Sequence, residues 1–361
     1  CLAVGAGFLL QPSGMRVLQE LGILDPVLDH ASQVRVLHVC EKGHADLMKL
    51  RYGDIGDHLF GAGLHRPVLL HFLLESMRLA GVNMHWAQEM VAAVREGPRW
   101  HLQNAQGDTW SDYDFLIIAD GARSRLRTIV DPTAENHGYA WGAHWFIGKN
   151  DGSFAEDELY QVVHGTKVLA GFLPTGHEIG QSDRLASLFW SIRVDEDQAL
   201  RAENIDVWKQ RVCDVVPRAA TFLEQIHGWE QILTARYGDV SMQRWSHQRA
   251  IVLGDAAHAM SPQLGQGVNL ALADAFCLTQ CLANAPIDQA LQLYARKRRF
   301  ALRYYQFATR ALTPWFQSHY EWLTPLRRVM FRGAQLLPFS RNLMTASMAG
   351  LIGDYRPSNE A

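Results

Sequence analysis

The sequence predicts an α/β protein in which a nucleotide-type domain with parallel strands carries an inserted antiparallel β-sheet and is followed by C-terminal helices. Two short apolar runs, residues 115–119 and 250–253, each lead into an acid next to a glycine. Such runs are typical of strands buried in a parallel sheet. Between them, residues 138–194 contain aromatic and β-branched runs at near-regular spacing, which favour an antiparallel sheet in a separate layer.

Composition indicates a folded protein with a large core. The chain has 361 residues, of which 48% are hydrophobic and 20% are charged, and its formal net charge is −3. This length and balance are typical of a globular protein with more than one domain. The one basic cluster, residues 296–299, is short and is interpreted as the exposed face of a helix, so nucleic acid is not expected as a partner.

Cysteine usage and hydropathy predict a cytoplasmic location. The five cysteines are odd in number and show no CxxC spacing, which favours free thiols in a reducing compartment. No apolar run approaches the roughly 18 residues that cross a bilayer, and the sequence opens on no signal peptide. The sixteen histidines include no HExxH motif and no His/Cys group at metal-binding spacing, so we expect no metal site. A Gly-x-Ser-x-Gly elbow, which would indicate a hydrolase, is also absent.

The first third of the chain alternates predicted helices and strands. Pro12 in a first turn and Gly22 as a stop predict a short amphipathic helix between them. Pro67 and Gly81 bound a second predicted helix with a broad apolar face. Strands are predicted at residues 34–39 and 45–50, which form a hairpin, and at residues 82–86, 91–94 and 100–102.

The remaining elements follow from the same patterns. Strands are predicted at residues 139–147, 159–163, 167–173, 185–192 and 232–240, and helices at 205–226 with a break at Pro217, at 268–282, at 287–309 and from Pro314 onward. We assign residues 1–32, 65–130 and 246–300 to the nucleotide-type domain, 33–64 and 131–245 to the inserted substrate domain, and 301–361 to a C-terminal helical segment.

The segment after residue 253 has the composition of a ligand-binding turn. Asp255 stands at the carboxyl end of a predicted strand, and Pro262, Gly265 and Gly267 precede a helix that begins at Val268. Small residues let a backbone approach a ligand closely, and the first amides of a helix are free and carry partial positive charge. This turn therefore suits an anionic or electron-rich ligand.

Two long motifs extend this interpretation. Residues 115–127 read Phe-Leu-Ile-Ile-Ala-Asp-Gly-Ala-Arg-Ser-Arg-Leu-Arg, which matches a strand followed by D-G-x-x-S-x-x-R. Residues 254–269 match G-D-A-A-H-x-x-x-P-x-x-G-x-G-x-N. In these motifs, and in residues 5–8, 65–66 and 139–145, the sequence resembles the FAD-dependent aromatic monooxygenases of the p-hydroxybenzoate hydroxylase fold.

The resemblance implies a cofactor site. Asp255 matches the acid that accepts hydrogen bonds from the ribityl chain of FAD, and the Pro262 turn matches the loop beside the pyrimidine end of the flavin. Asp120 and Arg127 match residues near the pyrophosphate and the approach of the nicotinamide, and Arg66 matches an arginine on the phosphate side. The predicted cofactor-binding residues are Arg66, Asp120, Arg127, Asp255, Pro262, Gly265, Gly267, Val268 and Asn269.

The resemblance also implies a reaction. NADH or NADPH would reduce the FAD, dioxygen would form a C4a-hydroperoxyflavin, and the substrate would be a phenolic or quinol-like aromatic molecule. Substrate-lining candidates are Trp141, Trp145, Phe172 and Trp190, of which strand alternation places only some toward the ligand. We expect His258 to be a structural hydrogen-bonding residue, and no catalytic residue can be assigned.

The N-terminal part departs from the family pattern. Members begin with a strand, a G-x-G-x-x-G turn and a helix, whereas residues 5–7 form only a superficial fragment of that motif because position 10 is Leu10. We therefore predict that the FAD-binding domain is N-terminally incomplete. The alternative function is a truncated or degenerate, FAD-deficient homologue that acts as a ligand-binding or partner-assembled module. Relatives that reduce, halogenate or epoxidise share the fold, but the Trp-x-Trp-x-Ile-Pro motif of the halogenases is absent.

Overall fold

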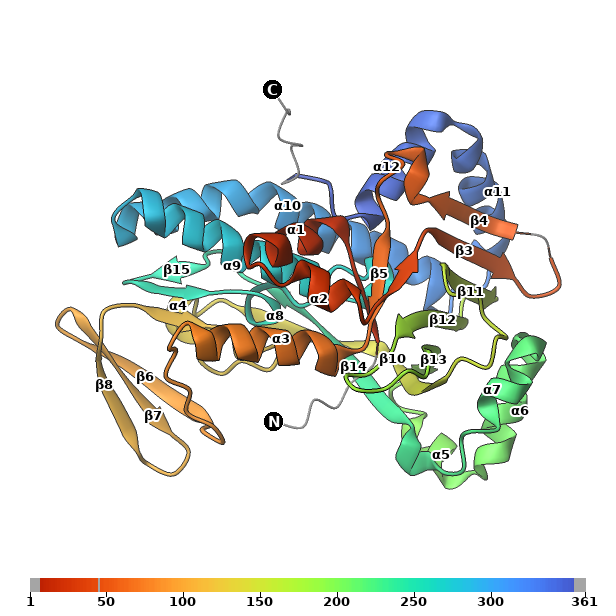
Figure 1. Cartoon of the computed structure of the whole chain (residues 1–361), viewed down its shortest axis with the longest axis horizontal. Coiled ribbons are helices and arrows are strands. Elements are labelled where there is room, and N and C mark those ends of the chain that lie inside the picture. Colours follow the sequence, from red (N-terminus) through yellow and green to blue (C-terminus); the bar gives the residue numbers. More distant parts are fainter. Residues whose placement is uncertain (1–6, 45, 354–361) are drawn as a thin grey trace.

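A seven-stranded mixed sheet is the largest element of the computed structural model, which describes residues 7–44 and 46–353 (Figure 1). Its strand order is β14-β10-β13-β12-β11-β3-β4. The strands are β3 (Val36–Glu41), β4 (Asp46–Arg51), β10 (Glu135–Lys149), β11 (Glu158–His164), β12 (Val168–Gly176), β13 (Leu185–Arg193) and β14 (Leu233–Ser241). The predicted strands and the predicted hairpin of β3 with β4 are confirmed.

The prediction of a purely antiparallel sheet is wrong at one junction. β11 pairs with β3 in parallel, with Tyr160 opposite His38, whereas every other neighbouring pair of this sheet is antiparallel. More than a hundred residues of chain separate the two strands, so no tight turn sets their relative direction. The hairpin of β3 and β4 therefore adds two strands at the edge of the sheet, and its inner strand β3 runs in the same direction as its neighbour β11.

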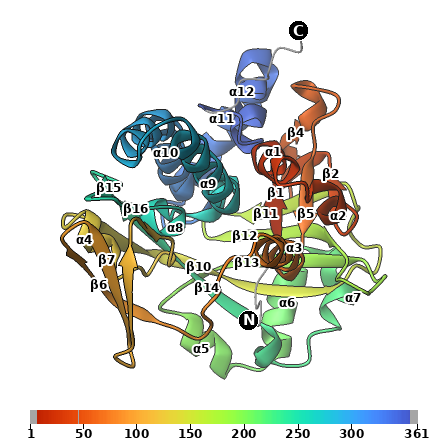
Figure 2. The ribbon, with the colours of Figure 1, turned by 60° about the vertical axis from the view of Figure 1, so that its left-hand side comes forward.

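The two faces of this sheet pack against different layers. On the outer face, the helices α5 (Asp197–Ala202), α6 (Ile205–Val215) and α7 (Ala220–Leu223) cover a core that includes Phe172, Trp190 and Phe222. On the inner face, Val39 and Leu169 pack with α11 (Leu323–Leu336) and α12 (Pro338–Met348). Figure 2 shows α5, α6 and α7 on one side of the sheet and α1 and α3 on the other.

A small second sheet carries the two predicted acid-glycine junctions. Its order is β15 (Ser246–His247), β16 (Ala250–Val252) and β9 (Leu116–Ile118), with β16 and β9 parallel as predicted. Helices α9 (Gly267–Asn284) and α10 (Ile287–Phe316) pack on it. Burial on both faces, which we predicted for the run at residues 250–253, holds for β16. β9 differs, because Ile117 is 49% exposed. β9 is an edge strand among the described residues, so its side chains have fewer neighbours.

A third sheet contains β6 (Met90–Glu96), β7 (Arg99–Asn104) and β8 (Thr109–Tyr113), and its Trp100 packs into the core around β16. The strands predicted near residues 91–94 and 100–102 are confirmed, and β8 was not predicted. The strand predicted at residues 82–86 is wrong. Val82 and Trp86 are exposed and no strand pairs with this segment, so its short alternation has no sheet to stabilise it.

The N-terminal part forms a fourth sheet and three helices. Strands β1 (Phe8–Leu10), β5 (Gly61–Leu64) and β2 (Ser32–Val34) pair antiparallel. Helices α1 (Pro12–Glu20) and α3 (Arg66–Leu79) confirm the two helices bounded by proline and glycine, and α2 (Leu24–Leu28) lies between them. Gly22 and Gly81 have φ of 70° and 69°, a conformation that glycine adopts without strain. Of the fragment at residues 5–7, only Gly7 belongs to the described part of the chain.

The C-terminal helices differ from the prediction at Pro314. α10 runs through this residue to Phe316, because a proline in the last turn removes only one helical hydrogen bond before the helix ends. The predicted domain boundary at residue 300 falls inside α10, whose Leu302 and Tyr305 pack with the core around β16. Among the described residues, no helix has the length and apolar character that a bilayer crossing requires.

Candidate functional site

The two acids of the sequence motifs leave the small sheet at the same edge. β9 and β16 run parallel with Ile118 opposite Val252, and the Leu253 N–H donates to the Ile118 carbonyl at 2.9 Å. Asp120 and Asp255 follow these strands by two and three residues, so the carboxyl ends of both strands present an acid on one side of the molecule. Both carboxylates are exposed, and no described residue hydrogen-bonds to either side chain.

A buried ion-pair network holds the turn that presents Asp255. Gly254 has φ of 58°, which favours glycine, and its N–H donates to Asp274 Oδ2 at 3.0 Å. The same carboxylate lies 2.5 Å from His258 Nε2 and 2.7 Å from Arg298 Nε. Burial opposes ionisation of Asp274, but His258 and Arg298 outweigh it and lower the pKa of this carboxyl to about 2. His258 therefore lies in a structural contact below the turn, as the sequence led us to expect.

The N-terminus of α9 lies next to Asp255. A Cβ on Gly267 would lie 3.7 Å from Asp255 Oδ1, so the carboxylate adjoins the first residue of the helix. The side chain of Gln266 makes no capping hydrogen bond, which leaves the first amides of α9 unoccupied by a side-chain cap. Gly265 has φ of 62°, and a Cβ there would meet nothing within 4 Å, so space adjoins the turn that begins at Pro262.

Asn269 joins three segments of chain. Its Oδ1 accepts from the Gln11 N–H at 2.8 Å, and its Nδ2 donates to the carbonyls of Leu9 at 3.2 Å and Gly265 at 3.1 Å. Asn269 is 1% exposed, so its side chain has a structural role in joining these segments. Val268, the preceding residue, packs against the apolar cluster of α1 and α3.

The two predicted arginines have different environments. The Arg127 guanidinium is buried and donates to the backbone carbonyls of Gly121, Ala122 and Ser124, so it holds the loop that follows β9. Burial lowers the pKa of Arg127, and Asp120 opposes this shift. Arg66 is the first residue of α3, is exposed, and makes no hydrogen bond or ion pair with any described residue. Arg66 thus remains available to an anionic ligand.

Strand alternation divides the predicted aromatic residues between the two faces of the seven-stranded sheet. Phe172 and Trp190 belong to the outer core beneath α6 and α7. Trp141 and Trp145 occupy alternate positions of β10 on the inner face, where Trp145 makes an edge contact with Phe189 at 5.1 Å between ring centres. The structure therefore places Trp141 and Trp145 on the inner face. It places Phe172 and Trp190 in the outer core beneath α6 and α7.

The inner face also carries polar groups that the sequence did not reveal. The hydroxyls of Thr175 and Ser187 are buried and have no hydrogen-bond partner in the described part of the chain. A Cβ on Gly7 would overlap the Thr175 methyl group and touch Ser187, so the start of β1 lies directly against this face. The Tyr237 hydroxyl lies beside the Trp145 indole, and burial raises the pKa of Tyr237. These residues stand in no sequence motif, and only strand register places them on the inner face.

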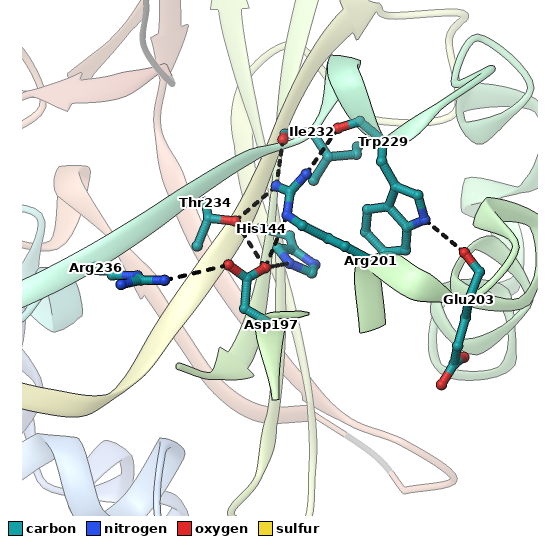
Figure 3. A network of polar contacts seen from close by, with 8 residues as sticks. All are labelled: His144, Asp197, Arg201, Glu203, Trp229, Ile232, Thr234 and Arg236. Atoms are coloured by element: carbon teal, nitrogen blue, oxygen red, sulfur yellow. Dashed lines mark hydrogen bonds and ion pairs between the residues drawn. The ribbon is translucent and has the colours of Figure 1, made fainter. Parts of the chain in front are cut away.

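A His–Asp pair on the outer face has a structural role (Figure 3). His144 Nε2 lies 2.9 Å from Asp197 Oδ1, and the same oxygen accepts from Arg201 at 3.1 Å and Thr234 at 3.0 Å. Arg201 also donates to the carbonyls of Trp229 and Ile232. Burial lowers the pKa of His144, although Asp197 opposes the shift. The network fastens α5 and the segment before β14 to β10.

Comparison with known families and relatives agrees with this geometry. A family model described as FAD binding domain matches residues 5–303. The chain is 27% identical over 292 residues to a 3-amino-4-hydroxybenzoate 2-monooxygenase of Streptomyces cremeus, covering 79% of this chain and 71% of that protein. It is also 27% identical over 312 residues to a kynurenine 3-monooxygenase of Stenotrophomonas maltophilia, covering 80% of this chain and 65% of that protein.

Solved structures share the fold. Klebsiella pneumoniae HpxO, complexed with FAD and uric acid, superposes with a TM-score of 0.79 at 17% identity, covering 97% of this chain and 89% of that one. P. aeruginosa PqsL, in complex with 2-aminobenzoylacetate, gives a TM-score of 0.78 at 22% identity, covering 92% and 90%. At these identities the likeness concerns the fold alone.

Proposed function

Since this chain belongs to the FAD binding domain family and is a flavoprotein monooxygenase, we propose that it consumes NADH or NADPH and hydroxylates a phenolic or quinol-like small molecule. The observation that carries the proposal is the convergence of Asp120, Asp255 and the N-terminus of α9 at one edge of the small sheet.

The residues present fit FAD. Asp255 is an exposed carboxylate without a partner in residues 7–44 and 46–353, and a carboxylate is a strong acceptor for the hydroxyls of a ribityl chain. The amides at the start of α9 suit the partial negative charge of the pyrimidine ring, and the free Arg66 guanidinium suits a diphosphate. When bound, FAD supplies hydride acceptance and dioxygen activation, which no amino-acid side chain provides.

The inner sheet face supplies the recognition groups that an aromatic substrate requires. Trp145 and Phe189 offer ring edges and faces for packing against an aromatic ring. The Tyr237 hydroxyl beside Trp145 can exchange hydrogen bonds with a phenolic oxygen. A buried hydroxyl without a partner is costly, so a polar substrate group that satisfies it would be bound selectively.

A coupled assay tests the proposal. FAD is added to the purified chain, and NADH or NADPH oxidation and oxygen consumption are followed with a panel of phenols, quinols and non-aromatic controls. We expect a phenolic compound to accelerate both rates and to gain one oxygen atom from labelled dioxygen. Reduction of all the oxygen to hydrogen peroxide, with no hydroxylated product for any compound, would contradict the proposal. Protein that stays colourless after FAD is added would instead indicate a ligand-binding module.

A further inference from the structure

Three potential metal ligands meet on the hairpin of β3 and β4, on the outer face of the seven-stranded sheet. His38 and Cys40 lie two residues apart on β3, so their side chains share a face. A register shift after Val39 places Asp46, the first residue of β4, directly opposite Cys40. None of these residues takes part in the site proposed for FAD.

The distances among the three ligand atoms suit one small cation. His38 Nε2 lies 2.9 Å from Asp46 Oδ1 and 3.3 Å from Cys40 Sγ, and Cys40 Sγ lies 3.7 Å from Asp46 Oδ1. The edges of a tetrahedral zinc site with these ligand types measure about 3.3–3.6 Å. A circle through the three atoms has a radius of about 1.9 Å, while zinc binds such ligands at about 2.0–2.3 Å. An ion would therefore lie slightly out of their plane, as it does above one face of a tetrahedron.

A fourth residue orients the histidine independently of these contacts. Glu158 Oε1 on β11 lies 2.6 Å from His38 Nδ1, across the parallel pairing of β11 with β3. A carboxylate at Nδ1 fixes the proton there and leaves the lone pair on Nε2, which points to Cys40 and Asp46. Histidines that bind metal ions have this arrangement, in which the second ring nitrogen donates to a carboxylate or carbonyl.

Charge and access also suit a divalent cation. With Cys40 as a thiolate and Asp46 ionised, the ligands carry two negative charges, and Glu158 adds a third close by. The Asp46 side chain is 61% exposed, whereas that of His38 is 16% exposed. An ion can thus enter from the Asp46 side, where water can supply the remaining coordination position.

We propose that His38, Cys40 and Asp46 bind one Zn²⁺-like cation, with Glu158 orienting His38 and water completing a tetrahedron. Binding forms three bonds from the protein to the metal ion and releases the Cys40 thiol proton to solvent, without oxidation or reduction. The ion would fasten β4 to β3 and stabilise this edge of the seven-stranded sheet. No sequence spacing motif predicts this site. The register of the hairpin and the pairing of β3 with β11 bring its residues together.

Cobalt substitution tests the proposal without reference to enzyme activity. The full chain is stripped with a chelator and titrated with Co²⁺, and we expect one equivalent to produce a thiolate charge-transfer band and the intense ligand-field bands of tetrahedral coordination. Cys40→Ser should abolish the charge-transfer band and weaken Zn²⁺ binding at least about tenfold. Cys213→Ser, at a half-buried cysteine on α6, is the matched control and should leave both unchanged.

A second variant separates ligand loss from misfolding. Glu158→Gln should retain the cobalt bands but weaken Zn²⁺ binding roughly 10–100-fold, because the imidazole is no longer held by a carboxylate. Zn²⁺ should also raise the melting temperature of the unmodified chain. A chain that shows no charge-transfer band and no thermal shift, or a Cys40→Ser variant that keeps the band, would overturn the proposal.

Discussion

His258 Nε2 lies 2.5 Å from Asp274 Oδ2, and both side chains are almost completely inaccessible to solvent. Arg298 Nε donates to the other carboxylate oxygen, Oδ1. The Gly254 N–H donates to Oδ2, the oxygen that lies near His258. One buried charge on α9 thus holds the turn that presents Asp255. Because a buried charge with satisfied partners is costly to disturb, this contact links the stability of the core to the shape of the proposed cofactor site.

Removing the charge of Asp274 should destabilise the protein in a pH-dependent way. Asp274→Asn should lower the free energy of unfolding by roughly 3–5 kcal/mol at pH 7, because the buried contacts of the Asp274 charge with His258 and Arg298 are lost. The pKa of Asp274 is lowered to about 2, so its contribution is fully present above about pH 4 and is lost as the pH falls toward 2. Thermal unfolding of the unmodified chain and of Asp274→Asn from pH 7 to pH 3 measures the gap in stability between the two proteins. A gap that is the same at every pH would contradict this assignment.

Asp255 should matter for FAD and not for folding. Because its carboxylate is exposed and has no described protein partner, Asp255→Asn should weaken FAD binding roughly 10–100-fold, the range expected for losing a hydrogen bond to a charged group. The melting temperature of the FAD-free protein should stay unchanged. Fluorescence titration with FAD measures the affinity, and Asp288→Asn, an exposed acid paired with Arg249, serves as control. Equal losses in both variants would indicate a nonspecific charge effect.

The two faces of the seven-stranded sheet should respond differently to substitution. Tyr237→Phe removes the hydroxyl beside Trp145 and should raise KM for the aromatic substrate about 3–10-fold, with little effect on stability. Phe172→Leu leaves a gap in the outer core and should cost about 1–2 kcal/mol of stability with KM unchanged. Steady-state kinetics and chemical denaturation of both variants distinguish the effects. The reverse pattern would place the substrate on the outer face.

The stability of the outer network should depend on the protonation of His144 below about pH 6.5. Burial lowers the pKa of His144, so the unfolded chain takes up a proton as the pH falls through about 6.5 while the folded chain resists it. His144 therefore favours folding fully only above that pH, and stability declines below it. His144→Gln, which keeps a donor for Asp197, should flatten this decline. Denaturation of both proteins at pH 7, 6 and 5 tests this, and parallel curves would contradict it.

Local patterns were sufficient for much of the fold. Proline and glycine at 12, 22, 67 and 81 predicted the ends of α1 and α3, because these residues restrict or permit particular backbone dihedral angles. The apolar runs that end in an acid and a glycine predicted β9 and β16 and their parallel pairing. The pattern failed at residues 82–86, where alternation without a pairing strand produced no sheet.

The sequence by itself determined the family and the acid at each strand end, since both depend on short stretches of neighbouring residues. The tertiary structure alone decided that Trp145 and Tyr237 share the inner face while Phe172 lies under α6 and α7. It also decided that His38, Cys40 and Asp46 meet. Alternation along a strand separates two faces but does not say which helices will cover each. That choice depends on register and packing between segments far apart in the chain.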